Sequence, residues 1–188
     1  MGKPLSNILN LANQITFSRI LMTPIILFLL YYPSSKLLSF IAMILFVVVS
    51  LTDILDGYIA RRAKTITALG KLLDPVADKV LICSTLIMLT YTQRIPVWLT
   101  IIIVVREILV TGLRAVAAES GYIIQADALG KIKTVLQNIA LSLLIIYYPY
   151  LGINPVPLGL FILYIAMFMA IISAIQYIYK YYNQFKDR

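Results

Sequence analysis

The sequence contains no histidine, a single cysteine and only eight acidic residues, and each shortage excludes a class of function. Without histidine, the chain cannot form a Ser-His or Cys-His nucleophile pair, a histidine-ligated zinc site or a histidine-ligated haem. Cys83 stands alone in an apolar run, which excludes an intrachain disulfide. These absences make the few carboxylates the most informative residues of the chain.

Apolar residues dominate what is present. They make up 61% of the chain, and the mean hydropathy is +0.92. Apolar runs of about 18 residues recur, and each is long enough to cross a bilayer as a helix. The composition therefore predicts an all-α, polytopic membrane protein. No linker, low-complexity tract or internal repeat marks off a second domain, so we expect residues 1–188 to form a single domain.

Proline, glycine and polar residues divide the chain into six expected transmembrane helices. Their ranges are 15–30, 37–61, 72–91, 97–118, 130–148 and 158–182. The first range follows a polar start without a cleavage site of small residues, which favours a retained helix over a signal peptide. Within residues 1–13, the apolar residues Leu5, Ile8, Leu9 and Leu11 lie among polar ones. This pattern favours a short interfacial helix, with an irregular polar leader as the alternative.

The basic residues predict the orientation of these helices. Six spans place both chain termini on one side of the membrane, together with the connections 61–71 and 119–129. Among the basic residues, only Lys36 and Arg94 fall at the opposite ends of helices. The positive-inside rule therefore makes the first side of this multi-pass protein cytoplasmic. The net charge of +8 is spread over several helix ends, which favours anionic lipid and phosphate-bearing substrates over nucleic acid.

Four of the eight acidic residues lie between positions 53 and 78, inside apolar segments. A charge buried in hydrocarbon costs about 2.5–3.5 kcal/mol on insertion scales, so these acids indicate function. Asp53 and Asp56 are three residues apart, Asp74 and Asp78 four, and either spacing puts a pair on one face of a helix. Converging carboxylates repel unless cations lie between them. Oxygen ligands of this kind favour a hard divalent ion such as Mg²⁺ or Mn²⁺.

Small and basic residues accompany the carboxylates. Gly57 and Ala60 keep one helix face small, which leaves room for a flat group such as a nucleobase. Arg61 supplies a fixed cation for a phosphate. Divalent ions held by carboxylates suit displacement at phosphorus, with one carboxylate taking the proton of the attacking hydroxyl. As the alternative, the acids form plain ion pairs with the neighbouring Arg62, Lys71 and Lys79.

The pattern Asp-x-x-Asp-Gly-x-x-Ala-Arg-x₈-Gly-x₃-Asp-x₃-Asp over residues 53–78 resembles the signature of the CDP-alcohol phosphotransferases at every defined position. The resemblance implies six membrane helices around a cytoplasm-facing polar cavity. It also implies two divalent cations, Mg²⁺ or Mn²⁺, and transfer of a phosphatidyl-type group from a CDP-linked donor to an alcohol, with release of CMP. Members are commonly homodimers, and a homodimer is therefore the implied assembly.

The resemblance assigns a role to each position of the signature. It makes Asp53, Asp56 and Asp74 metal ligands, and it makes Asp78 both a ligand and the general base. The implied donor-binding residues within the signature are Asp53, Gly57, Ala60, Arg61 and Gly70. Asn13 and Thr16 belong to a further segment that resembles one bacterial branch of the family, and they complete the donor set.

A second group of polar residues lies outside the signature. Arg106 and Glu107 fall near the middle of an expected helix, so they should face a polar cavity. Arg114 lies near the same face, and Lys131 and Lys133 open the next helix. These cations exceed what one diphosphate and two metal ions need, which indicates an anionic acceptor. The alternatives are pairing between helices with Glu107 or Glu119 for the arginines and positive-inside anchoring for the lysines.

The segments 70–79, 106–119 and 130–137 also resemble the bacterial branch whose acceptor is sn-glycerol 3-phosphate. This resemblance implies CDP-diacylglycerol as the donor and glycerol 3-phosphate as the acceptor, held by Arg106, Arg114, Lys131 and Lys133. Within the family, phosphatidylglycerol, as in cardiolipin synthesis, or an inositol phosphate remains open as the acceptor. Outside it, a small ion-coupled transporter would use buried acids, but the chain shows no internal repeat.

Overall fold

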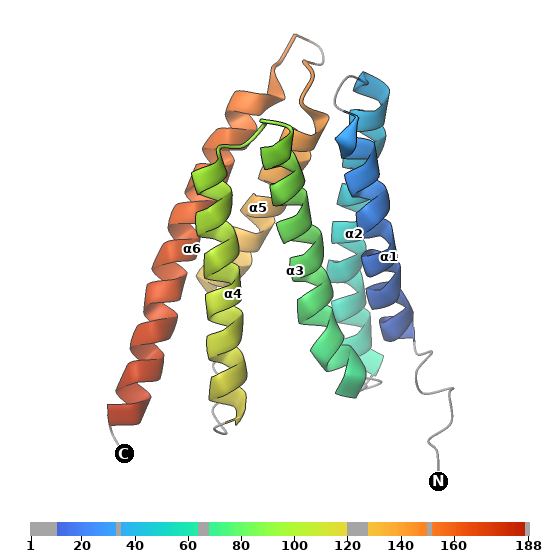
Figure 1. Ribbon diagram of the computed structural model, residues 1–188. Coiled ribbons are helices and arrows are strands. Elements are labelled where there is room, and N and C mark those ends of the chain that lie inside the picture. The colour runs from blue at the N-terminus through green and yellow to red at the C-terminus, as the bar shows by residue number, and fades with distance from the viewer. Residues whose placement is uncertain (1–10, 33–34, 64–67, 120–127, 150–151, 187–188) are drawn as a thin grey trace.

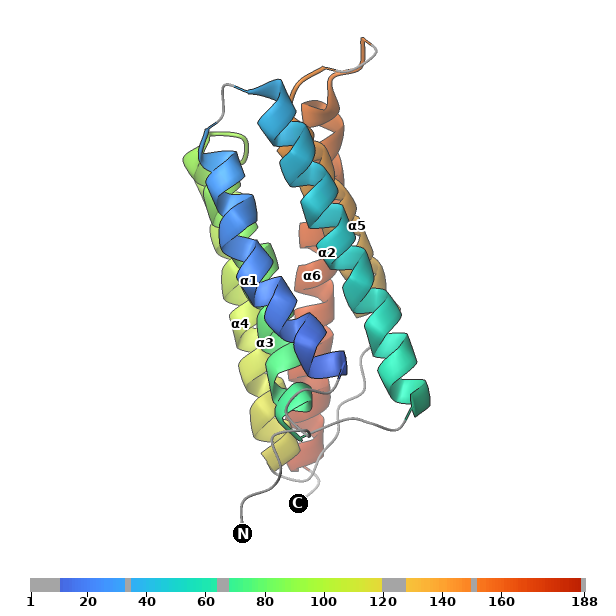
Figure 2. The same cartoon turned by 90° about the vertical axis from the view of Figure 1, so that its right-hand side faces the viewer.

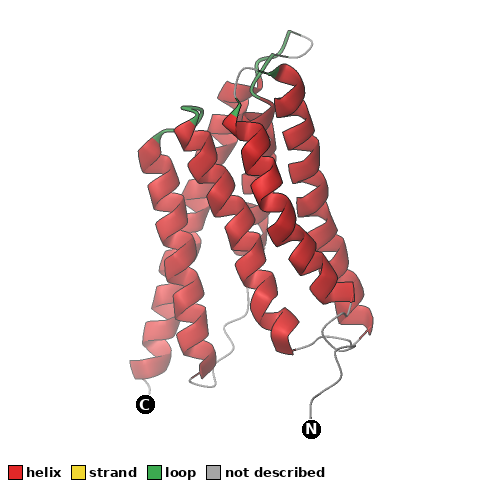
Figure 3. Ribbon diagram, turned by 45° about the vertical axis from the view of Figure 1, so that its right-hand side comes forward, coloured by secondary structure: helices red, strands yellow, loops and turns green. Residues whose placement is uncertain are grey.

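The computed structural model describes residues 11–32, 35–63, 68–119, 128–149 and 152–186. In these residues the chain forms six α-helices and no strand (Figures 1 and 3). The helices are α1 (Leu11–Tyr31), α2 (Lys36–Ala63), α3 (Ala68–Tyr91), α4 (Val97–Glu119), α5 (Ala128–Ile146) and α6 (Pro155–Lys186). The all-α class and the six helices expected from the sequence are confirmed. The expected interfacial helix falls mainly on residues 1–10, which lie outside the described residues.

Several helix boundaries differ by a few residues from the predicted ones, and two of these differences have clear local reasons. Helix α5 ends at Ile146 because Tyr147 has a positive φ of 57°, which a helix cannot continue through. Helix α6 begins at Pro155, three residues earlier than expected. Proline suits the first position of a helix because its missing N–H would be unpaired there. The preceding Asn154 caps this start, since its Oδ1 accepts a hydrogen bond of 3.1 Å from the N–H of Val156.

The six helices run up and down one bundle (Figures 1 and 2). Helix α5 packs along α6, α1 packs against both α2 and α3, α2 also packs against α5, and α4 packs against α6. The first residues of α1 and the last of α6 lie at the same end of the bundle, the lower end in Figure 1. The end of α2 and the start of α3 lie at that end too, and with them the two halves of the signature.

Apolar side chains fill the inside of the bundle and also cover its outside. Every helix contributes to a buried core, as shown by Ile26, Phe46, Leu86, Leu99, Leu141 and Leu163. Every helix also exposes large apolar residues, among them Leu21, Leu37, Ile87, Ile108, Val135 and Phe161. Helices that are apolar on both faces are typical of proteins surrounded by lipid, because exposing so large an apolar surface to water is unfavourable.

Within the described residues, one stretch is long and apolar enough to cross a membrane by length and composition. It runs from Pro155 to Tyr179 in α6 and has a mean hydropathy of 2.6. Shorter apolar stretches of 10–17 residues occur in α1, α2, α3 and α5. Helix α4 is continuous, but the charged residues Arg106, Glu107 and Arg114 interrupt its apolar sequence. The presence of six membrane spans therefore stays a prediction, while the six helices themselves are observed.

A glycine brings α5 and α6 close together. A Cβ atom at the buried Gly159 of α6 would lie 2.9 Å from Cγ of Leu144 and 3.1 Å from Cβ of Leu143, both in α5. At the other end of this helix pair, a Cβ at Gly130 would lie 3.9 Å from Oγ of Ser173. Small residues at such contacts allow helix backbones to approach closely, which is the usual way in which membrane helices associate.

Arg94 connects several helices at the upper end of the bundle. Its side chain is buried, and Nη1 donates to the carbonyl oxygens of Ile145 at 2.8 Å and Leu144 at 3.3 Å. Its Nη2 donates to Oγ of Ser39 at 3.4 Å, and the guanidinium lies 4.4 Å from the ring centroid of Tyr147. The cation thus satisfies the last carbonyls of α5, where the helix dipole is negative. The partners of Arg94 thus give it a structural role, and they lie far from the signature.

Candidate active site

The signature acids are divided between two consecutive helices. Asp53 and Asp56 lie in α2, and Asp74 and Asp78 lie in α3. The backbone is helical at all four positions, so each pair keeps the one-face spacing that the sequence predicts. The structure describes the backbone at these positions but not the side chains of the four acids. The same holds for the other predicted donor-site residues, Asn13, Thr16, Gly57, Ala60, Arg61 and Gly70.

These four positions suit divalent metal ions by their chemistry. All of them offer carboxylate oxygens, which hard cations such as Mg²⁺ and Mn²⁺ prefer. Each helix presents two acids on a single face, and both helices have their signature halves near the lower end of the bundle. The donor set and the helical spacing therefore fit a metal centre. Which oxygens would coordinate a metal stays a prediction.

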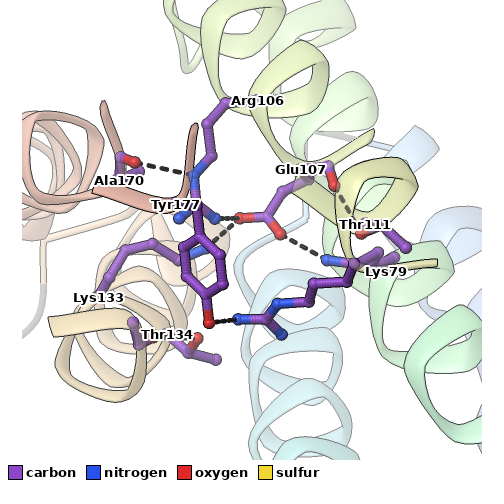
Figure 4. A network of polar contacts seen from close by, with 10 residues as sticks. Lys79, Arg106, Glu107, Thr111, Lys133, Thr134, Ala170 and Tyr177 are labelled. Carbon is purple, nitrogen blue, oxygen red and sulfur yellow. Dashed lines mark hydrogen bonds and ion pairs between the residues drawn. The ribbon is translucent and has the colours of Figure 1, made fainter. Parts of the chain in front are cut away.

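One described polar network stands out in the bundle, and we call it the Glu107 network (Figure 4). Its members are Lys79 from α3, Arg106 and Glu107 from α4, and Lys133 from α5. Nζ of Lys79 lies 2.6 Å from Oε2 of Glu107, and Nη1 of Arg106 lies 3.0 Å from Oε1. Nζ of Lys133 also bonds to Oε1. Three cations from three helices thus converge on one carboxylate.

The network is buried and carries an excess of positive charge. Arg106, Glu107 and Lys133 are 9%, 7% and 4% exposed, and Lys79 is partly buried. Its four side chains carry three positive charges and one negative charge. Buried charges are costly unless counter-charges and hydrogen bonds satisfy them. Such an arrangement favours the binding of a further anion.

Arg106 has a second partner, which fixes the direction of its side chain. Its Nε donates to the carbonyl oxygen of Ala170 in α6 at 2.9 Å. Figure 4 shows this bond on one side of the guanidinium and the bond to Glu107 on the other. The planar guanidinium is therefore held by two helices at once, which suits it to a fixed position at a binding site.

Arg114 lies eight residues further along α4, about 12 Å of helix. Its Nη2 donates to the hydroxyl of Tyr177 at 2.5 Å, and the guanidinium lies 4.7 Å from the centroid of the same ring. Tyr177 is fully buried in the bundle, whereas Arg114 is exposed. The tyrosine therefore anchors the arginine by a hydrogen bond and a cation–π contact.

The structure brings together two of the four predicted acceptor residues, Arg106 and Lys133. Arg114 bonds to Tyr177 instead, and the side chain of Lys131 lies outside the described residues. Arg106 does pair with Glu107, but the pair lies within α4 and not between helices, as the alternative required. This pairing does not decide whether the cations bind phosphate, so the acceptor site stays a prediction.

Lys79 is not among the acceptor residues that the sequence predicts. The sequence suggests it only as an alternative ion-pair partner of the signature acids, whereas its described partner is Glu107 on the next helix. A signal was present, because Lys79 directly follows Asp78 at the start of an apolar stretch. A lysine at such a position is costly and needs a nearby partner.

Residues 9–178 match the CDP-alcohol phosphatidyltransferase family, and the chain belongs to that family. A relative from Bacillus subtilis (strain 168) is named CDP-diacylglycerol–glycerol-3-phosphate 3-phosphatidyltransferase. It is 37% identical over 188 aligned residues, which cover 94% of this chain and 97% of the relative. A relative of the same name from Rickettsia typhi is 40% identical and covers 89% of this chain and 94% of its own length.

A third relative, from Mycobacterium tuberculosis, is named probable phosphatidylglycerophosphate synthase. It is 37% identical over 143 residues, covering 75% of this chain and 68% of the relative. The family resemblance that residues 53–78 carry is thereby confirmed. The family is generally dependent on a divalent metal ion, and its members here are bacterial membrane enzymes. Both properties agree with the clustered acids and with the apolar outer surface of the bundle.

Proposed function

We propose that this protein transfers the phosphatidyl group of CDP-diacylglycerol to sn-glycerol 3-phosphate, forming phosphatidylglycerol phosphate and CMP. The observation that carries the proposal is the convergence of Lys79, Arg106 and Lys133 on the single carboxylate of Glu107. A buried excess of cations suits an acceptor that brings its own phosphate, since charge-assisted hydrogen bonds to phosphate are strong. The names of the relatives from B. subtilis and R. typhi support the same donor and acceptor.

In the proposed reaction, the free primary hydroxyl of glycerol 3-phosphate attacks the phosphorus that carries the diacylglycerol. A new P–O bond forms as the P–O bond to CMP breaks, and CMP leaves with the electron pair. Asp78 takes the proton of the attacking hydroxyl. Asp53, Asp56, Asp74 and Asp78 hold two divalent cations, Mg²⁺ or Mn²⁺, which when bound neutralise the charge on the phosphate oxygens.

The donor lies along the signature. Gly57 and Ala60 leave a face of α2 without bulk, which suits the flat cytidine. Arg61 binds the diphosphate, Gly70 permits a close approach at the start of α3, and Asn13 and Thr16 of α1 complete the donor site. The acyl chains stay in the membrane, because moving them into water is unfavourable.

The acceptor phosphate lies beside the Glu107 network. Arg106 and Lys133 bind it directly, and Lys131 and Arg114 bind it from the side nearer the lower end of the bundle. The two substrates are therefore held by different cations, with Arg61 and the metal ions on the donor. This separation means that donor and acceptor affinities can be changed independently.

The proposed setting is a bacterial cell membrane. The six helices all cross the bilayer, and both termini and the active site face the cytoplasm, where the basic residues concentrate. Residues 1–188 form one domain, with residues 1–13 in the membrane interface, and the assembly is a homodimer. Both proposed substrates are reached from this side, the donor within the bilayer and the acceptor from the water.

An acceptor assay tests the function. Purified protein in detergent is given radiolabelled CDP-diacylglycerol with glycerol 3-phosphate, phosphatidylglycerol or an inositol phosphate, and the labelled lipid product is identified. The proposal predicts phosphatidylglycerol phosphate from glycerol 3-phosphate, in equal amount to the released CMP, and little product from the other acceptors. A product formed mainly from another alcohol would replace the proposed acceptor while keeping the reaction type.

A further inference from the structure

Glu107 connects more of the bundle than any of the cations that it binds. Its Oε2 accepts from Lys79 of α3, and its Oε1 accepts from Arg106 of α4 and Lys133 of α5. Through Arg106, which also bonds to the carbonyl oxygen of Ala170, the connection reaches α6. Both carboxylate oxygens are therefore occupied by cations (Figure 4). A single acid thus sets the mutual position of side chains from three helices.

The three cations could not take these positions unaided. They point toward one another in a buried site, where like charges repel more strongly than in water. Lysine is also a flexible side chain with a single charged atom at its end, so Lys79 and Lys133 would turn away from each other without a common partner. The carboxylate of Glu107 supplies that partner and still leaves the group with a net positive charge.

We propose that Glu107 is a positioning residue that holds Lys79, Arg106 and Lys133 as a preformed receptor for the acceptor's phosphate. This inference rests on the proposed function and deepens it. Lys79 joins the phosphate-binding cations, and Glu107 acts through the cations without touching either substrate. The excess of two positive charges in the network matches the charge of a phosphate monoester dianion. Preformed receptors bind more tightly because their side chains need no ordering when the ligand arrives.

The test replaces the charge of Glu107 while keeping its shape. Steady-state CMP release is measured for Glu107→Gln, with glycerol 3-phosphate varied at saturating CDP-diacylglycerol and then the reverse. We expect the acceptor KM to rise roughly 10- to 100-fold, as misplaced binding groups typically cost. The donor KM should change by less than about threefold, because the donor is held by other residues. Glu107→Asp keeps the charge but is one methylene shorter, and we expect a smaller rise of the acceptor KM.

Arg94→Gln is the matched structural control. Arg94 is also a buried cation that bonds between helices, but it lies in the connection between α3 and α4, whereas the Glu107 network lies midway along these two helices. Its replacement should lower the thermal unfolding midpoint and leave both KM values unchanged. The control separates a general loss of stability from a loss of cation placement.

An unchanged or lower acceptor KM in Glu107→Gln would overturn the proposal, because Glu107 would then be irrelevant or a competitor of the phosphate. A parallel rise of both KM values would also overturn it, since that result indicates a structural role. If Glu107→Gln does not fold, the acceptor KM of Glu107→Asp decides in the same way. If the parent enzyme uses another alcohol, the proposed function and this inference fail together. If Lys133→Gln raises the acceptor KM and the Glu107 variants do not, only this inference fails.

Discussion

At the scale of single residues, the proposed mechanism needs side chains that take part in the reaction and side chains that hold others in place. Asp78 belongs to the first kind, because it is assigned the proton of the acceptor hydroxyl. Glu107 and Tyr177 belong to the second kind, since their described partners are the cations Lys79, Arg106, Lys133 and Arg114. The two kinds of residue should fail in different ways when they are replaced.

The substitution Asp78→Asn tests the role of the base. Asparagine keeps the size and a hydrogen-bonding oxygen but cannot take a proton, so turnover should fall by roughly 10²–10⁴-fold. Binding of CDP-diacylglycerol, measured on the purified variant, should persist. Turnover close to that of the parent would place the base on another residue.

At the scale of helices, the packing of α5 on α6 fixes the position of α5, the helix that carries Lys133. Gly159 of α6 lies in this contact, opposite Leu143 and Leu144 of α5. Because Leu144 and Leu143 are already within van der Waals distance of a would-be Cβ, a larger side chain has no room here.

The substitution Gly159→Leu should therefore destabilise the bundle by about 1–3 kcal/mol, the usual cost of overpacking. Thermal unfolding in detergent measures the effect as a lower midpoint. The matched control is Gly112→Leu in α4, because nothing lies within 4 Å of a Cβ at that exposed glycine. Equal midpoints for the two variants would show that the close contact does not limit the packing.

The sequence was sufficient to predict the helices because long apolar runs and their polar breaks are local properties. It was also sufficient to predict that the two acids of α2 share one helix face and that the two acids of α3 do so as well, since helical spacing is also a local property. The convergence of Lys79 and Lys133 on Glu107 could not be predicted. It depends on how α3, α4 and α5 are rotated and shifted against one another, and no spacing within one helix determines that. The end of α5 was missed because the positive φ of Tyr147 belongs to a residue type that rarely adopts it.

At the scale of the whole molecule, the bundle is apolar outside and carries its charged network inside. This arrangement suits a reaction between a lipid that stays in the bilayer and a charged, water-soluble acceptor. The family's dependence on a divalent metal ion adds a third component, and we propose the acids of α2 and α3 as its oxygen ligands.

Removal of the metal should therefore stop the reaction without unfolding the protein. We expect excess EDTA to abolish CMP release and added Mg²⁺ or Mn²⁺ to restore it. The helical content, measured by circular dichroism, should stay constant throughout, because the bundle is held by apolar packing. Full activity in excess chelator would contradict the metal-dependent mechanism.

The central claim is that the buried cations recognise the phosphate of the acceptor. The most direct measurement compares kcat/KM for glycerol 3-phosphate and for glycerol, in the parent enzyme and in Lys133→Gln. If Lys133 binds the phosphate, the variant loses about 1.5–3 kcal/mol of transition-state stabilisation with glycerol 3-phosphate, or roughly 10- to 150-fold. With glycerol, which has no phosphate to bind, the substitution should change little. Equal losses with both acceptors, or a parent enzyme that uses glycerol as well as glycerol 3-phosphate, would contradict the claim.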